Sequence, residues 1–242
     1  MALELKRNPL KRTLQNAARL RTIVGVFAGH GFHNVAERIK LGRFLVERIT
    51  GTDMDRYSAP QRVRMAFEEL GPTFVKLGQV LATRPDLVPE EYVEEFAYLH
   101  DRVQPLPFDT IKEVLKAEYG ARGEEIFESI DPAPLGSASI AQVHRARLKT
   151  GEDVVIKIQR PGIIKTISED LNVLYMLAEL LYKYVPETRP FSPIAIVDEF
   201  FKTLELETNF IVEANNIRRF QQHFTHDPDI LFHRVYLDHT TS

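Results

Sequence analysis

The stretch VVIKIQRPG, residues 154–162, sets a lysine in a run of β-branched residues and ends in Pro-Gly. Because side chains alternate along a strand, Val154, Ile156 and Ile158 share one face and Lys157 lies on the other. A second, roughly alternating run covers residues 140–148, and residues 149–152 join the two runs. The sequence therefore predicts a β-hairpin over residues 140–159.

A loop of small residues, PLGSAS at residues 134–139, precedes this hairpin. Side chains without bulk let backbone N–H groups approach a polyphosphate, and a lysine on a third strand supplies a point charge for it. A small-residue loop, a hairpin and a strand lysine in this order are typical of a phosphate site. The alternative is that Lys157 is an exposed strand lysine, which is common in proteins.

One long helix is predicted from Ser192 and Pro193 towards Phe224. Its apolar residues recur at steps of three, four or seven: Val197, Phe200, Leu204, Ile211 and Ala214. Glu207 falls within this stripe, where an ionised carboxylate needs a partner, and Lys157 is the nearest plausible cation. We therefore predict a buried ion pair between Lys157 and Glu207. The alternative is that Glu207 lies on the flank of the helix and is solvated.

The first 120 residues carry helical patterns separated by proline and glycine. Helices are predicted to begin at Pro60, at Thr73 and at Pro89, and Asp109 is predicted to cap a fourth that ends at Gly120.

Two more elements are predicted after the hairpin. Thr166 and Glu169 have the spacing of a capping box at the start of a helix, and residues 230–237 have the pattern of a strand. Helices, a small sheet and no internal repeat together predict an α+β protein.

The helix from Thr73 contains FVKLGQ, residues 74–79, in which polar residues interrupt an apolar pattern. Its apolar side is predicted to be buried and its polar side, with Lys76 and Gln79, to face a pocket. Gly78 costs about 1 kcal/mol in a helix interior, which predicts that another backbone comes close there. The alternative is a surface lysine beside a chance glycine.

Four motifs, PLGSASIAQVHRA, VVIKIQRPG, FVKLGQVLATRPDLVP and ETNFIVEANN, together resemble the UbiB/AarF-like (ADCK-type) family of atypical kinases, which is linked to ubiquinone (coenzyme Q) biosynthesis. The resemblance runs from about Arg19 to the last residue. It implies a protein-kinase-like N-lobe, a small antiparallel sheet with long helices, over residues 123–242. Residues 1–122 are then an all-helical N-terminal extension that carries the KxGQ motif.

For nucleotide binding, the resemblance implies that Lys157 is the lysine that contacts the phosphates and that Glu207, from the ExD signature, pairs with it. In the family that the sequence resembles, an alanine-rich loop replaces the glycine-rich loop of ordinary kinases. Gly136, Ser137, Ala138 and Ser139 match that loop.

The resemblance also implies gating residues. Lys76, Gly78 and Gln79 match the KxGQ signature, on a helix that lies over the active site in the family. Asn209 stands where the ExD signature has its second acid, which weakens the acidic side of the contact with that helix, although an amide still bonds to Lys76 or Gln79. Glu213 belongs to the EAxN continuation of the same signature.

The implied cofactor is ATP or ADP with Mg²⁺. The 242 residues contain no DFG and no catalytic loop of the HxD type, so no catalytic residue is assigned, and the metal ligands are expected in an absent C-lobe. We expect this N-terminal fragment to be inactive in phosphoryl transfer. There is no cysteine, and we expect His223, His226 and His233 to be surface residues and not a metal site.

The charge of the chain indicates which binding partners to expect. The net charge of −3 gives no general attraction to nucleic acid. Between Glu4 and Glu37 every charged side chain is basic, which favours contact with a membrane surface or prenyl lipid as strongly as a solvated helix packed on the protein. No stretch approaches the roughly 20 apolar residues of a spanning helix. We therefore expect a cytoplasmic protein, peripheral to the inner membrane.

Two rival functions remain open. A non-catalytic scaffold that binds lipid or membrane would use the basic N-terminal helices and leave the pocket empty. A relative of aminoglycoside or choline kinases would share the N-lobe but would have no reason for the KxGQ extension.

Overall fold

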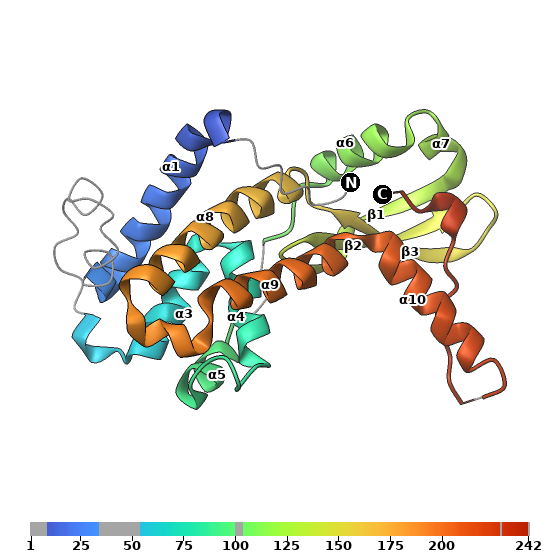
Figure 1. The fold of residues 1–242 in the computed structure, drawn as a ribbon. Helices are drawn as coiled ribbons and strands as arrows, with labels where there is room; N and C mark the ends of the chain where they lie inside the picture. The colour runs from blue at the N-terminus through green and yellow to red at the C-terminus, as the bar shows by residue number, and fades with distance from the viewer. Residues whose placement is uncertain (1–8, 34–53, 100–103, 228, 242) are drawn as a thin grey trace. The chain divides into compact units, whose positions relative to one another are not determined.

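The computed structural model describes residues 9–33, 54–99, 104–227 and 229–241. It confirms the predicted α+β class. Three strands form one antiparallel sheet in the order β1-β2-β3: β1 Phe127–Ser137, β2 Ala141–Leu148 and β3 Asp153–Gln159 (Figure 1). The predicted hairpin is thus present as β2 and β3.

Helices make up most of the remaining described chain: α1 Pro9–Phe27, α3 Ala59–Leu70, α4 Pro72–Ala82, α5 Glu90–Phe96, α6 Phe108–Tyr119, α7 Arg122–Ile126, α8 Ile163–Tyr184, α9 Pro193–Thr208 and α10 Phe210–His223. A π-helical turn, Ala28–Phe32, follows α1, and 3₁₀ turns cover Met54–Arg56, Pro186–Phe191 and Leu237–His239. The helices predicted near Pro60, Thr73 and Pro89 are confirmed. The short helix before Gly120 is confirmed as α6, but Pro107 is its N-cap and Asp109 bonds to Lys112 instead.

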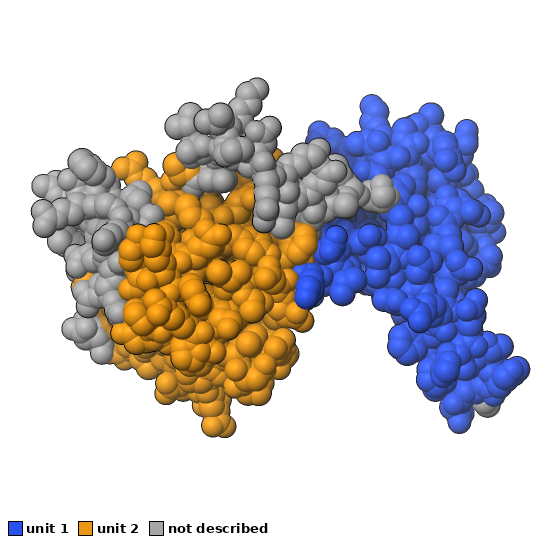
Figure 2. Space-filling view, in the orientation of Figure 1, with its two compact units in different colours: residues 1–3, 103–161, 202–242 blue, residues 4–102, 162–201 orange. Residues whose placement is uncertain are grey.

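The chain divides into two compact units (Figure 2). The sheet unit comprises residues 1–3, 103–161 and 202–242, and the helical unit comprises residues 4–102 and 162–201. Both units are discontinuous in sequence, because residues 162–201 between β3 and the second half of α9 belong to the helical unit. The domain boundary predicted after residue 122 stays a prediction.

In the sheet unit, the two faces of the sheet differ in burial. Gln142, His144, Ala146 and Leu148 of β2 are buried, whereas the residues between them are half-buried or exposed. The buried face is covered at the start of α6, where the ring of Phe108 lies 5.8 Å from the ring of His144. Lys157 pairs with Val143 and therefore lies on the open face, as the alternation of its strand predicts.

In the helical unit, aromatic rings hold the helices together. The ring centroid of Phe67 in α3 lies 5.3 Å from that of Phe96 in α5, 5.9 Å from that of Phe74 in α4 and 6.2 Å from that of Phe27 in α1. Such pairs add about 0.5–1.5 kcal/mol each beyond the area they bury. This cluster places α4, which carries the KxGQ motif, against α3 and α5.

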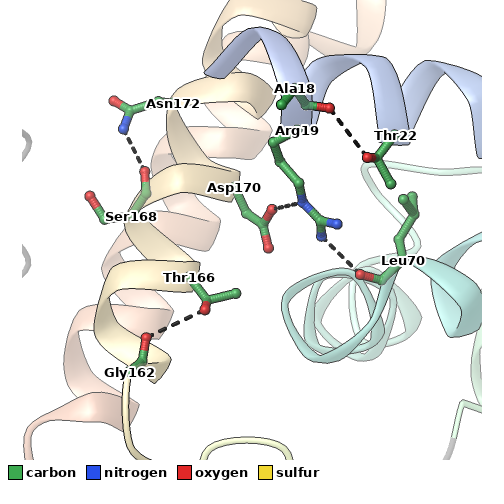
Figure 3. A network of polar contacts seen from close by, with 9 residues as sticks. All are labelled: Ala18, Arg19, Thr22, Leu70, Gly162, Thr166, Ser168, Asp170 and Asn172. Carbon is green, nitrogen blue, oxygen red and sulfur yellow. Dashed lines mark hydrogen bonds and ion pairs between the residues drawn. The ribbon is translucent and has the colours of Figure 1, made fainter. Parts of the chain in front are cut away.

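A buried ion pair joins α1 to α8 across the helical unit (Figure 3). Arg19 donates from Nε to Asp170 Oδ1 at 2.5 Å and from Nη2 to the carbonyl of Leu70 at 2.9 Å. The carbonyl of Leu70 is one of those that the end of α3 leaves without a helical partner, so Arg19 caps α3 as well. Asp170 is 1% exposed, which makes this pair a structural element of the unit.

The helix predicted after the hairpin is confirmed as α8, but its predicted cap is wrong, and so is one predicted strand. Helix α8 begins at Ile163, directly after Gly162 with a left-handed φ of 76°, so Thr166 lies inside the helix and not at its cap. Residues 230–237 form no strand: residues 231–236 have no regular secondary structure, and a 3₁₀ turn begins at Leu237.

Within the described residues, every helix is too short or too polar to cross a bilayer. The side chains of the basic segment before Ala17 lie outside the described residues, so the predicted membrane contact there stays a prediction.

Candidate functional site

The row of residues through Lys157 crosses the whole sheet. Lys157 pairs with Val143 of β2, and Val143 pairs with Gly136 of β1. Since neighbouring strands lie about 4.8 Å apart, the backbones of Gly136 and Lys157 are about 10 Å apart on the same face. A Cβ atom at Gly136 would meet no atom within 4 Å, so the glycine leaves open space beside the row.

A cavity of about 1400 Å³ lies over this open face. Its lining includes Val143, Lys157, Phe210, Glu213 and Ala214, from the sheet and from α10. The volume exceeds the roughly 300–1,000 Å³ of a typical ligand site, so it has room for a nucleotide.

The predicted phosphate loop is more ordered than the sequence suggested. Strand β1 extends to Ser137, so the prediction of a loop from Pro134 to Ser139 is wrong for its first four residues, Gly136 and Ser137 among them. Ala138 donates its N–H to the carbonyl of Ala141 at 2.8 Å, and Ser139 is 1% exposed. The loop is therefore a tight turn between β1 and β2, and the N–H of Ala138 is already bonded within it.

Lys157 forms an ion pair with Glu213 of α10. Its Nζ lies 2.6 Å from Glu213 Oε2 and 4.7 Å from the ring centroid of Phe210. The side chains of Lys157 and Glu213 are 41% and 48% exposed, so the pair is open to solvent and adds little to stability. The Lys157 ammonium has three N–H donors, so it can also donate to an anionic ligand in the cavity.

The predicted burial of Lys157 and Glu207 is wrong, since both are exposed. Glu207 lies in the last turn of α9, and the predicted single helix is two helices that meet at Asn209. The stripe counted from Leu204 to Ala214 therefore runs through a break. Glu213, one turn into α10, is the residue that reaches Lys157.

Asn209 makes this break. Its backbone is extended, and its side-chain oxygen accepts from the N–H groups of Ile211 at 3.1 Å and Val212 at 3.2 Å. Aspartate and asparagine cap helices about equally well, so the amide serves this purpose without a charge. Gln159, which lies on the same face of β3 as Lys157, donates to the carbonyl of Thr208 at 3.0 Å and ties the end of α9 to the sheet.

We expect Asn209→Ala to lower the free energy of unfolding by about 1 kcal/mol, because two N–H groups of α10 lose their acceptor. Asn209→Asp, which keeps the cap, is the matched control and should retain full stability. Urea denaturation of the 242-residue chain followed by circular dichroism measures both. Equal stability of the alanine and aspartate variants would contradict the capping role.

The KxGQ residues lie on α4 in the helical unit. Phe74, Leu77 and Leu81 are buried, as predicted. Gln79 donates from Nε2 to the carbonyl of Leu99 at 3.3 Å, so its amide links α4 to the residues after α5. Lys76 is half-buried. Their gating of a pocket stays a prediction.

Gly78 has the close neighbours that the sequence predicted, but they are side chains and not another backbone. A Cβ atom there would come within 2.1 Å of Leu99 Cδ1 and 2.9 Å of Phe67 Cδ2.

Among the residues that the structure describes, no group of three or more histidine or acidic side chains could hold a metal ion. His223, His226 and His233 are exposed. The sequence analysis did not predict the contact of Phe210 with Lys157 or the pairing of Glu213 with Lys157. Asn209, a residue type that favours helix N-caps, is the sequence signal for a second helix that carries both residues.

Comparisons with known proteins show which family the chain resembles. The model of the ABC1 atypical kinase-like domain matches residues 98–242. Proteins named Probable protein kinase UbiB are similar: that of Marinobacter nauticus is 40% identical over 185 residues, 76% of this chain and 34% of the relative. That of Aeromonas hydrophila is 42% identical over 179 residues, 74% of this chain and 33% of the relative. The chain thus spans about a third of the length of these curated relatives.

A solved structure of Rv3197 from Mycobacterium tuberculosis in complex with erythromycin is 30% identical. The match covers 66% of this chain and 40% of that one, with a TM-score of 0.46.

Proposed function

Since this chain belongs to the ABC1 atypical kinase-like family, as a UbiB-like member, we propose that its sheet unit binds the phosphates of a nucleotide. The proposed role of the intact protein is that of an atypical kinase or ATPase that supports ubiquinone biosynthesis. Peripheral contact with a membrane or prenyl lipid, and gating by Lys76 and Gln79, are parts of the same proposal.

One observation carries the proposal: Lys157 lies on the open face of the sheet, on the edge strand β3, and lines a cavity large enough for a nucleotide. Its ammonium is partly exposed and held between Glu213 and the Phe210 ring, so it is oriented before a ligand arrives. Gly136, in the same row, leaves the space that a phosphate chain needs.

The proposed cofactor, ATP or ADP with Mg²⁺, would supply a transferable phosphoryl group when bound. Lys157 would contact its phosphates, and Glu213 would keep the ammonium of Lys157 aimed at the cavity. We propose that these 242 residues bind nucleotide without turning it over, because they contain no DFG and no HxD-type loop. Measurable ATP hydrolysis by the purified chain would contradict this part.

The binding proposal is tested by calorimetric titration of the chain with ATP and ADP. Lys157→Ala removes a charge-assisted contact worth about 1.5–3 kcal/mol, so the affinity should fall about 10-fold to 100-fold. Lys149→Ala, an exposed lysine in the turn between β2 and β3, is the matched control and should bind as the wild type does. Unchanged affinity in Lys157→Ala, with liposome binding that is lost when residues 1–30 are removed, would favour the lipid-binding scaffold.

A further inference from the structure

Strands β2 and β3, which the structure describes over their full length, place three cations on the open face of the sheet. Side chains alternate along both strands, so Arg145 and Arg147 share the face of Lys157. Lys157 pairs with Glu213, and Arg147 contacts two carboxylates at 3.2 Å and 3.4 Å. No acceptor among the described residues contacts the Arg145 guanidinium. Arg145 therefore carries a full charge without a partner.

Arg145 lines the same cavity as Lys157, one step further along the sheet. It is exposed, and opposite it on β3 lies Val155, which is 62% exposed although it is apolar. Arg145 and Lys157 are diagonal neighbours on an antiparallel pair, so their side chains start about 7–8 Å apart. Both side chains are long enough to contact one ligand.

The lining of the cavity indicates the direction in which a nucleotide bound at Lys157 extends. From Lys157 the lining continues to Arg147 and Asp153, near the turn between β2 and β3. It includes none of the described residues 133–142, which lie towards the other end of the sheet. If the phosphates contact Lys157, the ribose and the base therefore lie over Arg145 and Val155.

A guanidinium beside an exposed apolar side chain matches the chemistry of a purine base, which has apolar flat faces and a polar edge. The five N–H groups of arginine can only donate. Guanine presents two neighbouring acceptors, N7 and O6, to which a guanidinium donates two parallel hydrogen bonds. Adenine presents N7 beside the N6 amine, which is itself a donor, so only one of the two bonds forms.

We propose that Arg145 recognises the base, and that it makes the site bind guanine nucleotides more tightly than adenine nucleotides. This inference rests on the proposed nucleotide function of the sheet unit and deepens it, since ATP and ADP still bind with one hydrogen bond fewer. A lysine cannot replace the arginine, because an ammonium is a point charge without the planar fork.

The test is a calorimetric titration of the chain with four nucleotides and with inorganic triphosphate. The wild type should bind GTP about 10-fold more tightly than ATP, as one bidentate contact predicts. ITP keeps N7 and O6 but lacks the 2-amino group, so it should bind as GTP does. 7-Deaza-GTP lacks N7 and should lose most of the advantage over ATP.

Arg145→Met keeps an unbranched side chain at this position and removes its donors. The affinity for GTP should fall about 10-fold and that for ATP less than about 3-fold. The affinity for inorganic triphosphate, which has no base, should fall less than about 2-fold. Arg145→Lys should not restore the preference for GTP. Since Arg145 is exposed, both variants should fold, which circular dichroism checks.

Arg147→Met is the matched control, because Arg147 lies on the same strand and the same face but is already paired with Glu128 and Asp153. It should keep the wild-type ratio of GTP to ATP affinity. A loss of the preference in Arg147→Met as large as that in Arg145→Met would contradict the assignment to Arg145.

The outcomes separate this inference from the proposed function. If Lys157→Ala weakens nucleotide binding while the wild type binds GTP no more tightly than ATP, only the role of Arg145 is refuted. If Arg145→Met weakens GTP, ATP and inorganic triphosphate equally, the arginine attracts phosphates and does not recognise the base, so the inference also fails. If neither Lys157→Ala nor Arg145→Met changes any affinity, the nucleotide site itself is refuted.

Discussion

Replacing Asp170 by alanine is expected to lower the free energy of unfolding of the helical unit by about 3 kcal/mol. This is the lower end of the range of about 3–5 kcal/mol for breaking a buried ion pair, because Arg19 is 25% exposed. The alanine leaves the Nε of Arg19 without its acceptor next to the Phe74 ring, whose centroid lies 5.8 Å from the guanidinium carbon. A charged donor in that position keeps its desolvation cost and loses its compensation.

The measurement is hydrogen exchange across α1 and α8, because these are the helices that the pair joins. Exchange in residues 17–27 should quicken about 100-fold, which corresponds to about 3 kcal/mol. The matched control is Glu169→Ala on the same helix, whose contact with Lys165 spans 3.9 Å in an exposed pair and should be worth under about 0.5 kcal/mol. Equal protection in the two variants would show that the pair does not hold α1.

Asp170→Asn separates the charge from the hydrogen bond. The amide oxygen can still accept from Arg19, but its NH₂ group would take the place of Oδ2, a buried atom with no hydrogen-bond partner among the described residues. We therefore expect a loss between that of Glu169→Ala and that of Asp170→Ala.

The β2–β3 hairpin could be predicted because its signals are local. Alternation placed Lys157 opposite its apolar neighbours, and a four-residue turn fixed the register. Strand β1 was missed because Pro132, Pro134 and Gly136 argue against a strand. As an edge strand with register shifts, β1 tolerates them, since its outer side needs no ladder hydrogen bonds.

The error at the candidate site had a different cause. A helical wheel assumes one continuous helix, so it placed Glu207 in the same stripe as Ala214. Asn209 caps a new helix, α10, so the residues after it do not continue the stripe of α9. In α10, Glu213 is the acidic residue that reaches Lys157 on the sheet. The strand predicted over residues 230–237 failed for a related reason: alternation alone does not form a strand, which needs a partner for its backbone groups.

Two substitutions of glycine by alanine, at Gly78 and Gly25, are expected to change stability in opposite directions. Both glycines lie inside helices of the helical unit, so both gain about 1 kcal/mol of helix propensity from a Cβ atom. At Gly25 the new atom meets nothing within 4 Å, so Gly25→Ala should raise the free energy of unfolding by about 1 kcal/mol.

At Gly78 the new Cβ atom has no room, so the alanine is expected to lower the free energy of unfolding. Leu99 and Phe67 are 4% and 6% exposed, and Phe67 packs on three other aromatic rings, so neither side chain can move freely. Overpacking at such a site costs about 3 kcal/mol, which outweighs the gain in propensity and leaves a net loss of about 2 kcal/mol.

Urea denaturation of the Gly25→Ala and Gly78→Ala variants measures this difference in stability. In the double variant Gly78→Ala, Leu99→Ala the added methyl enters the space left by leucine, so the loss should be smaller than the sum of the single losses by about 1 kcal/mol or more. Additive losses, or a stabilised Gly78→Ala variant, would show that α4 does not pack against Leu99 as closely as the structure has it.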